Sequence, residues 1–145
     1  DGSLRGYFED TIKKLEIADR FSFAGLVPPS EVYRYIALMN VLVHFSLREG
    51  LPRAAVQALA SARPVVAYNL DGTPEVVKNN VTGKLIDPDD TRKATDAVIE
   101  LLSDNAAARQ MGQNGRELVS KLFDWRRMSD ILIEDYEKCL KEKKH

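Results

Sequence analysis

A short apolar run, a turn rich in charged residues and an alanine-rich segment follow one another over residues 41–60. Residues 41–45 have the length and the β-branched content of a buried strand. Residues 54–60 contain strong helix formers, and Pro52 suits the first position of that helix. The order strand, tight turn, helix is typical of an open α/β sheet, in which ligands bind outside the carboxyl ends of the strands.

The turn between the strand and the helix carries groups that can bind a ligand. A helix start leaves backbone N–H groups unpaired and has a partial positive charge, so it binds anions such as phosphate. Gly50 allows a ligand to approach the backbone closely. Glu49 repels a phosphate, and a neutral group such as a sugar hydroxyl suits it better. The residues leave a second interpretation open, in which Glu49 caps the helix that Leu51 begins.

Five short segments occur in a fixed order after residue 48. They are Glu49-Gly50, Gln57-Ala58-Leu59-Ala60, Arg63-Pro64-Val65-Val66-Ala67, Asp71-Gly72-Thr73-Pro74-Glu75-Val76-Val77 and Thr82-Gly83-Lys84-Leu85-Ile86. Together they resemble the donor-binding half of the group-one retaining glycosyltransferases, a family with the two-domain GT-B fold. The family pattern has a Glu, seven residues, a second Glu, a small-residue stretch and Pro-Val-Val-Ala. One position departs from it, because Gln57 stands where the second Glu is expected.

The resemblance implies a transferase that moves a sugar from a nucleotide-sugar donor to an acceptor hydroxyl with retention of the anomeric configuration. The implied partners are a nucleotide-diphosphate sugar and an acceptor sugar, lipid or other hydroxyl compound. No cofactor and no metal is expected, because a helix dipole and basic side chains hold the leaving diphosphate in this family. Two alternatives remain, a nucleotide-sugar epimerase of similar architecture and a non-catalytic nucleotide-binding or interaction module.

The same resemblance implies roles for one acidic side chain, Glu49, and one amide side chain, Gln57. Glu49 is the expected catalytic residue and would hold a hydroxyl of the transferred sugar. Gln57 takes the place of the Glu that grips the ribose hydroxyls. Its carbonyl oxygen can still accept a hydrogen bond, but without the charge that strengthens such a bond. The departure therefore puts ribose affinity in question rather than the fold.

Further donor-binding residues are implied around this pair. The backbone of residues 50–53 would face the sugar and diphosphate, Gly72 would make room for the sugar, and a loop after the first strand would contact the base through its main chain. These residues are Gly50, Leu51, Pro52, Arg53, Gly72, Leu26 and Val27. Each has a structural alternative. The loop at residues 26–27 can be a plain turn, Arg53 can be an unpartnered surface arginine, and Asp71 and Glu75 can simply stabilise a helix start.

The predicted fold is α/β, a Rossmann-like parallel sheet with helices on both faces. Strands are predicted at residues 20–24, 41–46, 64–68 and 84–86, and helices at residues 3–15, 30–39, 54–60, 74–77, 91–103, 104–111, 112–123 and 125–141. Strands that alternate with helices imply right-handed crossovers and parallel pairing. Residues 1–145 are expected to form one donor-binding domain truncated at the N-terminus, since the family's sheet has about six strands. Asp1 and Gly2 resemble the end of its Gly-Asp-Gly turn. The helix at 125–141 is expected to pack toward the missing acceptor domain.

Composition excludes several classes of function. The formal charge of −1 provides no basic field for nucleic acid. Cys139 is the single cysteine, and no cysteine–histidine spacing suits a metal. His44 lies within a predicted strand, where a lone histidine is most often a core residue. No apolar run is long enough to span a bilayer. A cytoplasmic location is expected, with any peripheral membrane association through the missing domain, and residues 141–145 are expected to form a solvated tail.

Overall fold

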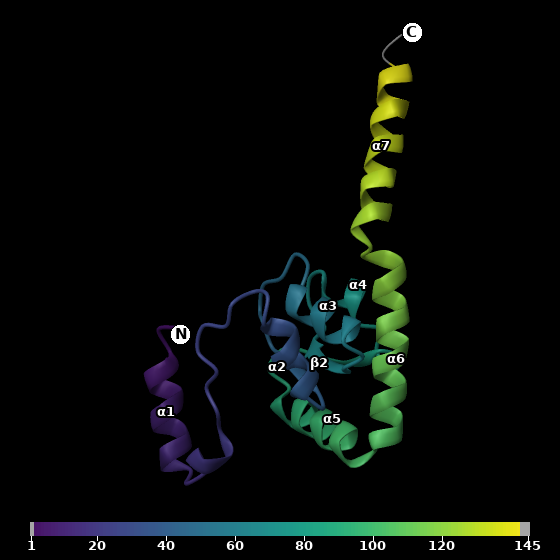
Figure 1. Ribbon diagram of the computed structural model, residues 1–145. Helices are drawn as coiled ribbons and strands as arrows, with labels where there is room; N and C mark the ends of the chain where they lie inside the picture. Colours follow the sequence, from purple (N-terminus) through teal and green to yellow (C-terminus); the bar gives the residue numbers. More distant parts are fainter. Residues whose placement is uncertain (1, 143–145) are drawn as a thin grey trace. The chain divides into compact units, whose positions relative to one another are not determined.

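The computed structural model describes residues 2–142 (Figure 1). Its elements, in chain order, are α1 (Arg5–Lys14), the 3-10 helix η1 (Ala18–Arg20), α2 (Val32–Leu38), β1 (Leu42–His44), α3 (Arg53–Ala60), β2 (Val65–Tyr68), α4 (Thr73–Val76), β3 (Gly83–Ile86), α5 (Thr91–Ser103), α6 (Asn105–Leu122) and α7 (Trp125–Glu142). Asp1 and residues 143–145 of the predicted tail lie outside the described residues. The chain divides into two units, of which the first ends at Val32 and the second begins at Tyr33.

The second unit contains a parallel sheet of three strands in the order β1-β2-β3. Leu42 pairs with Val65, and Val65 in turn pairs with Gly83. Three of the predicted strands are therefore confirmed, and so is their parallel arrangement. The close pairing of β2 with β3 requires a glycine at the first position of β3, because a Cβ on Gly83 would overlap the carbonyl oxygen of Val65.

The predicted strand at residues 20–24 is not part of this sheet. Phe21 has an extended backbone, but the sheet of the described residues contains only β1, β2 and β3. Both Phe21 and Phe23 are exposed in the first unit. The alternating pattern predicted a strand, but a strand also needs a neighbouring strand to receive its hydrogen bonds.

Helices cover both faces of the sheet, as predicted. On one face, Val66 of β2 and Ile86 of β3 form a buried cluster with Ala94, Ala97 and Leu101 of α5. Neighbouring residues of a strand point to opposite faces, so Val65 and Ala67 point away from this cluster. The helix α3 contacts β1 and β2 and supplies the buried side chains of Ala55, Ala58 and Leu59.

Two short helices were predicted over residues 104–123, but α6 is a single helix of 18 residues. Glycine lowers helix propensity, which is why the sequence predicted a break at Gly112. In the structure Gly112 and Gly115 are buried where α6 packs on the end of α3. A Cβ on Gly112 would overlap the carbonyl oxygen of Ala62, and one on Gly115 would press into Leu59. These glycines allow a close helix–helix contact rather than ending the helix.

The helix α5 begins and ends at the predicted residues, and Asp90 caps its N-terminus. The Lys93 N–H donates to Asp90 Oδ1 at 3.0 Å, and Lys93 Nζ lies 2.9 Å from Asp90 Oδ2. The hydrogen bonds from the side chain and backbone of Lys93 lower the pKa of the Asp90 carboxyl. The same pairing raises the pKa of the Lys93 ammonium.

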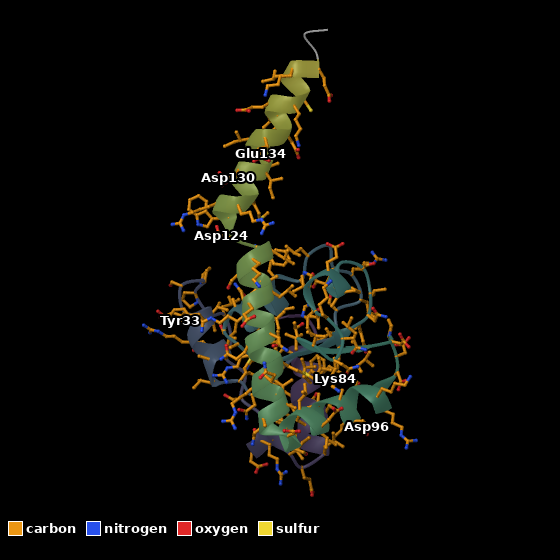
Figure 2. All side chains as sticks on the ribbon, turned by 90° about the vertical axis from the view of Figure 1, so that its right-hand side faces the viewer. Tyr33, Lys84, Asp96, Asp124, Asp130 and Glu134 are labelled. Atoms are coloured by element: carbon orange, nitrogen blue, oxygen red, sulfur yellow. The ribbon has the colours of Figure 1, made fainter. Side chains whose placement is uncertain are left out.

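The final helix, α7, has no buried residue. Its polar side chains include Asp130 and Glu134, which Figure 2 labels. Its large apolar side chains are also exposed, namely Trp125, Met128, Ile131, Leu132, Ile133, Tyr136 and Leu140. That this helix packs toward an acceptor domain stays a prediction. Within residues 2–142, no helix combines the length and the apolar character that crossing a membrane requires.

Candidate functional site

The loop of residues 45–52 connects the carboxyl end of β1 to the first residue of α3, Arg53. Pro52 is buried and lies at the N-cap of α3, one position before the helix rather than at its first position as predicted. No side chain makes a capping hydrogen bond at this end. The backbone N–H groups of the first turn of α3 are therefore not served by a cap, which suits an anion-binding position.

The loop that follows β2 is joined to the loop of residues 45–52 by two hydrogen bonds. The backbone N–H of Glu49 donates to Asp71 Oδ2 at 3.2 Å, and the N–H of Gly72 donates to the carbonyl oxygen of Glu49 at 3.1 Å. Asp71 has φ 49, a left-handed conformation that aspartate adopts more readily than most residues. Gly72 is buried so close to Gly50 that a Cβ there would overlap the Gly50 carbonyl oxygen. The two loops therefore form one unit.

The carboxylate of Glu49 is held by His44, the last residue of β1. Glu49 Oε1 lies 3.1 Å from His44 Nε2, and the side chains are 27% and 19% exposed. An ionised carboxylate only accepts hydrogen bonds, so Nε2 of the imidazole carries the proton and donates. The sequence favoured a core residue over a catalyst at His44, and the structure shows its side chain half-buried and in contact with Glu49. The Glu49 side chain is directed to His44, and the structure shows no cap by Glu49 on α3.

An open hollow of about 710 Å³ lies between the two loops. Its lining consists of Leu47, Arg48, Glu49, Gly50, Asp71, Gly72 and Glu75. Three of these residues are acidic and one is basic, so the hollow itself is unsuited to a phosphate. Carboxylate oxygens accept hydrogen bonds from hydroxyl groups, and a neutral ligand with several hydroxyls fits this lining. The volume lies in the range of small-molecule sites, about 300–1,000 Å³.

The remaining predicted residues lie outside the hollow. Arg53 and Gln57 are both exposed on α3 and are four residues apart, which places them on the same side of the helix. Leu51 is exposed just before this helix. Leu26 and Val27 belong to the first unit, where Leu26 is exposed and Val27 is partly buried. The structure thus brings Glu49, Gly50 and Gly72 together at one hollow. Leu51 and Pro52 lead from this hollow into α3, the helix labelled in Figure 1 that carries Arg53 and Gln57.

The sequence placed residues 71–75 on the same sheet edge as Glu49, but it predicted neither the hydrogen bond to Asp71 nor the contact with His44. His44 lies five residues before Glu49 at the end of a strand, and Asp71 lies 22 residues after it at the end of the next strand. Parallel strands end at the same edge of a sheet, which is why Asp71 was expected near Glu49, and the same rule could have pointed to His44. Among residues 2–142 there is no group of three or more histidine, cysteine, aspartate or glutamate side chains that could hold a metal ion.

A parallel α/β sheet with a ligand-sized hollow at the carboxyl ends of its strands is the arrangement in which open α/β domains bind their ligands. The model of the family of group-one glycosyl transferases matches residues 1–118, and the chain therefore belongs to this family. The resemblance inferred from the sequence is confirmed.

The chain is 34% identical over 131 residues to a GDP-mannose-dependent alpha-(1-6)-phosphatidylinositol monomannoside mannosyltransferase of Mycobacterium tuberculosis, covering 83% of this chain and 34% of that protein. Among solved structures it resembles sucrose-phosphate synthase of Thermosynechococcus elongatus, with a TM-score of 0.88, 30% identity and coverage of 97% and 35%. HepE of Anabaena in complex with UDP-glucose shares the fold, with a TM-score of 0.84, 22% identity and coverage of 92% and 36%. The chain spans about a third of the length of these relatives.

Proposed function

We propose that this chain is the donor-binding domain of a glycosyltransferase that moves a sugar from a nucleotide-diphosphate sugar to an acceptor hydroxyl with retention of configuration. The observation that carries the proposal is the Glu49–Gly50 turn, held against Asp71 and Gly72 beside the start of α3. Two relatives support a nucleotide-sugar donor, since one is named GDP-mannose-dependent and another was solved with UDP-glucose.

In this proposal the sugar occupies the hollow between the two loops. Glu49 accepts a hydrogen bond from one sugar hydroxyl through the carboxylate oxygen that His44 leaves free. Gly50 is exposed and has no heavy atom near the position of a Cβ, so the sugar can approach its backbone. Because Gly72 has no Cβ, the loop that follows β2 can lie directly against the carbonyl group of Gly50.

The diphosphate belongs at the start of α3. The carboxylates of Glu49, Asp71 and Glu75 repel it from the hollow. The uncapped first turn of α3 and the exposed Arg53 attract it. Positive charge from these groups stabilises the leaving diphosphate as the bond to the sugar breaks, so no bound metal is needed in this mechanism.

Gln57 is proposed to accept a hydrogen bond from the ribose, one helical turn beyond the start of α3. The main chain at Leu26 and Val27 is proposed to contact the base. An acceptor-binding domain outside these residues would supply the acceptor hydroxyl and complete the site.

Turnover of the intact protein with Glu49→Ala tests the proposal. UDP-glucose and GDP-mannose serve as donors, and UDP and GDP serve as nucleotide probes. The variant should lose about a hundredfold in kcat/KM, on the order expected when a charged hydrogen bond to the reacting sugar is lost. It should bind UDP or GDP nearly as the unchanged protein does, because Glu49 is not assigned to the nucleotide.

Asp96→Ala is the matched control, since Asp96 is an exposed acid on α5 (Figure 2) and α5 covers the opposite face of the sheet from α3. This variant should retain full turnover. A Glu49→Ala protein that melts early but turns over normally would contradict the assignment of Glu49. Interconversion of the nucleotide sugars without transfer would indicate an epimerase, and binding without any reaction would indicate a non-catalytic module.

A further inference from the structure

We propose that His44 is a positioning residue, which fixes the Glu49 carboxylate so that one of its oxygens faces the donor sugar. The proposal rests on the proposed function, because it needs Glu49 to contact the sugar. The observation that carries it is the 3.1 Å contact between His44 Nε2 and Glu49 Oε1, made by two half-buried side chains.

Glu49 needs such a partner, because its surroundings would otherwise leave the carboxylate unplaced. A glutamate side chain has several rotatable bonds, and this one lies in a loop that borders an open hollow. Asp71 and Glu75 line the same hollow and repel the Glu49 carboxylate. Asp71 is bonded to the backbone N–H of Glu49, which fixes the main chain but not the side chain. The imidazole supplies the one hydrogen bond recorded for the carboxylate within residues 2–142.

The strand provides a rigid anchor for the imidazole. His44 is the last residue of β1 and pairs with Ala67 of β2, which is fully buried. Its side chain shares a face of the sheet with those of Leu42 and Ala67, opposite the face that carries Val66 and the α5 cluster. The ring is therefore held by the sheet, whereas Glu49 is held by a loop. A hydrogen bond from the ring therefore fixes the position of the carboxylate relative to the sheet.

His44 does not line the hollow, and so it acts on a ligand through Glu49. With Oε1 occupied by the imidazole N–H, the second carboxylate oxygen remains to accept a hydrogen bond from the sugar. The strand itself has no need of an imidazole, because an apolar residue suits a half-buried strand position equally well. The contact with the Glu49 carboxylate explains why residue 44 has a polar side chain.

The test compares His44→Leu with His44→Gln in the intact protein. Leucine fills a similar volume without a donor, whereas the amide nitrogen of glutamine is the same number of bonds from Cβ as Nε2 of histidine. The probes are UDP and GDP, and UDP-glucose and GDP-mannose. His44→Leu should weaken binding of the nucleotide sugar about tenfold and leave the nucleotide diphosphate unchanged, since only the sugar contact depends on Glu49. His44→Gln should stay within about threefold of the unchanged protein.

Lys84→Leu is the matched control for loss of a strand residue that pairs with a carboxylate. Lys84 lies on β3 with its Nζ 2.6 Å from Glu100 Oε1, and Figure 2 labels this side chain. The variant should bind every probe as the unchanged protein does. If His44→Leu weakens nucleotide and nucleotide sugar equally, or if His44→Gln fails as badly as His44→Leu, the residue has only a structural role and the proposal is overturned.

The double variant His44→Leu, Glu49→Ala separates this proposal from the proposed function. If His44 acts only through Glu49, its removal adds nothing to the loss caused by Glu49→Ala, and the two effects are not additive. A Glu49→Ala protein with normal sugar affinity and turnover would overturn the proposed function and the role of His44 together. A defective Glu49→Ala protein beside a normal His44→Leu protein would overturn the role of His44 alone.

Discussion

Replacement of Gly72 by alanine should disturb the site through one steric contact. The backbone of Gly72 has φ −77 and ψ −1, which an alanine adopts without strain. The added Cβ, however, would overlap the Gly50 carbonyl oxygen and would lie 2.9 Å from the Gly50 carbonyl carbon. Both are backbone atoms, so no flexible side chain can move aside. The two loops must separate, and the hydrogen bond from the Gly72 N–H to the Glu49 carbonyl oxygen is strained or lost.

The size of the effect follows from these two changes. Overpacking of a buried position destabilises by about 1–3 kcal/mol, and a neutral hydrogen bond contributes about 1 kcal/mol. We therefore expect Gly72→Ala to lower the free energy of unfolding by about 2–4 kcal/mol. For a domain of this size that corresponds to a decrease in Tm of about 10 °C. Thermal unfolding of the chain, followed by circular dichroism, measures it.

Gly50→Ala is the matched control for stability, because no heavy atom lies within 4 Å of the position of its Cβ. This variant should unfold within about 0.5 kcal/mol of the unchanged chain. It should nevertheless weaken nucleotide-sugar binding in the intact protein, since Gly50 lines the hollow and an added methyl group would hinder close approach of the sugar to its backbone. A Gly72→Ala chain that melts at the same temperature as the Gly50→Ala chain would refute the close contact between the loops.

Three further outcomes are expected. Because hydrogen bonds from Lys93 lower the pKa of Asp90 from its ordinary value of 3.8, its contribution to stability is present above that value and is lost as the pH falls through the lower value of the folded chain. Asp90→Asn should therefore flatten the acid side of the plot of Tm against pH. Gln57→Ala should weaken nucleotide and nucleotide sugar alike by about 1 kcal/mol in calorimetry, and Gln57→Glu should bind as well or slightly better. Leu101→Ala removes a side chain that is 2% exposed in the α5 cluster and should lower the free energy of unfolding by about 2–5 kcal/mol in urea titrations.

The sequence alone determined the elements whose cause is local. Residues 91–103 form a helix between the predicted ends, because Asp90 supplies a cap and the apolar residues repeat at helical spacing. The three strands β1, β2 and β3 could be predicted for a similar reason, since each is a short apolar run bounded by turn residues. Five segments in order were enough to predict the family, and the match over residues 1–118 confirmed it.

Only the tertiary structure decided how segments far apart in the chain meet. By propensity Gly112 is a helix breaker. Only the folded chain shows that a side chain at this position would overlap the carbonyl oxygen of Ala62 at the end of α3. The segment at residues 20–24 has the pattern of a strand, but a strand also depends on a neighbour that pattern cannot supply. The sequence favours a core position for His44. In the folded chain the loop after it turns back, and Glu49 Oε1 lies 3.1 Å from His44 Nε2. Propensity acts between residues close in the sequence, whereas these contacts depend on how the loops close at the edge of the sheet.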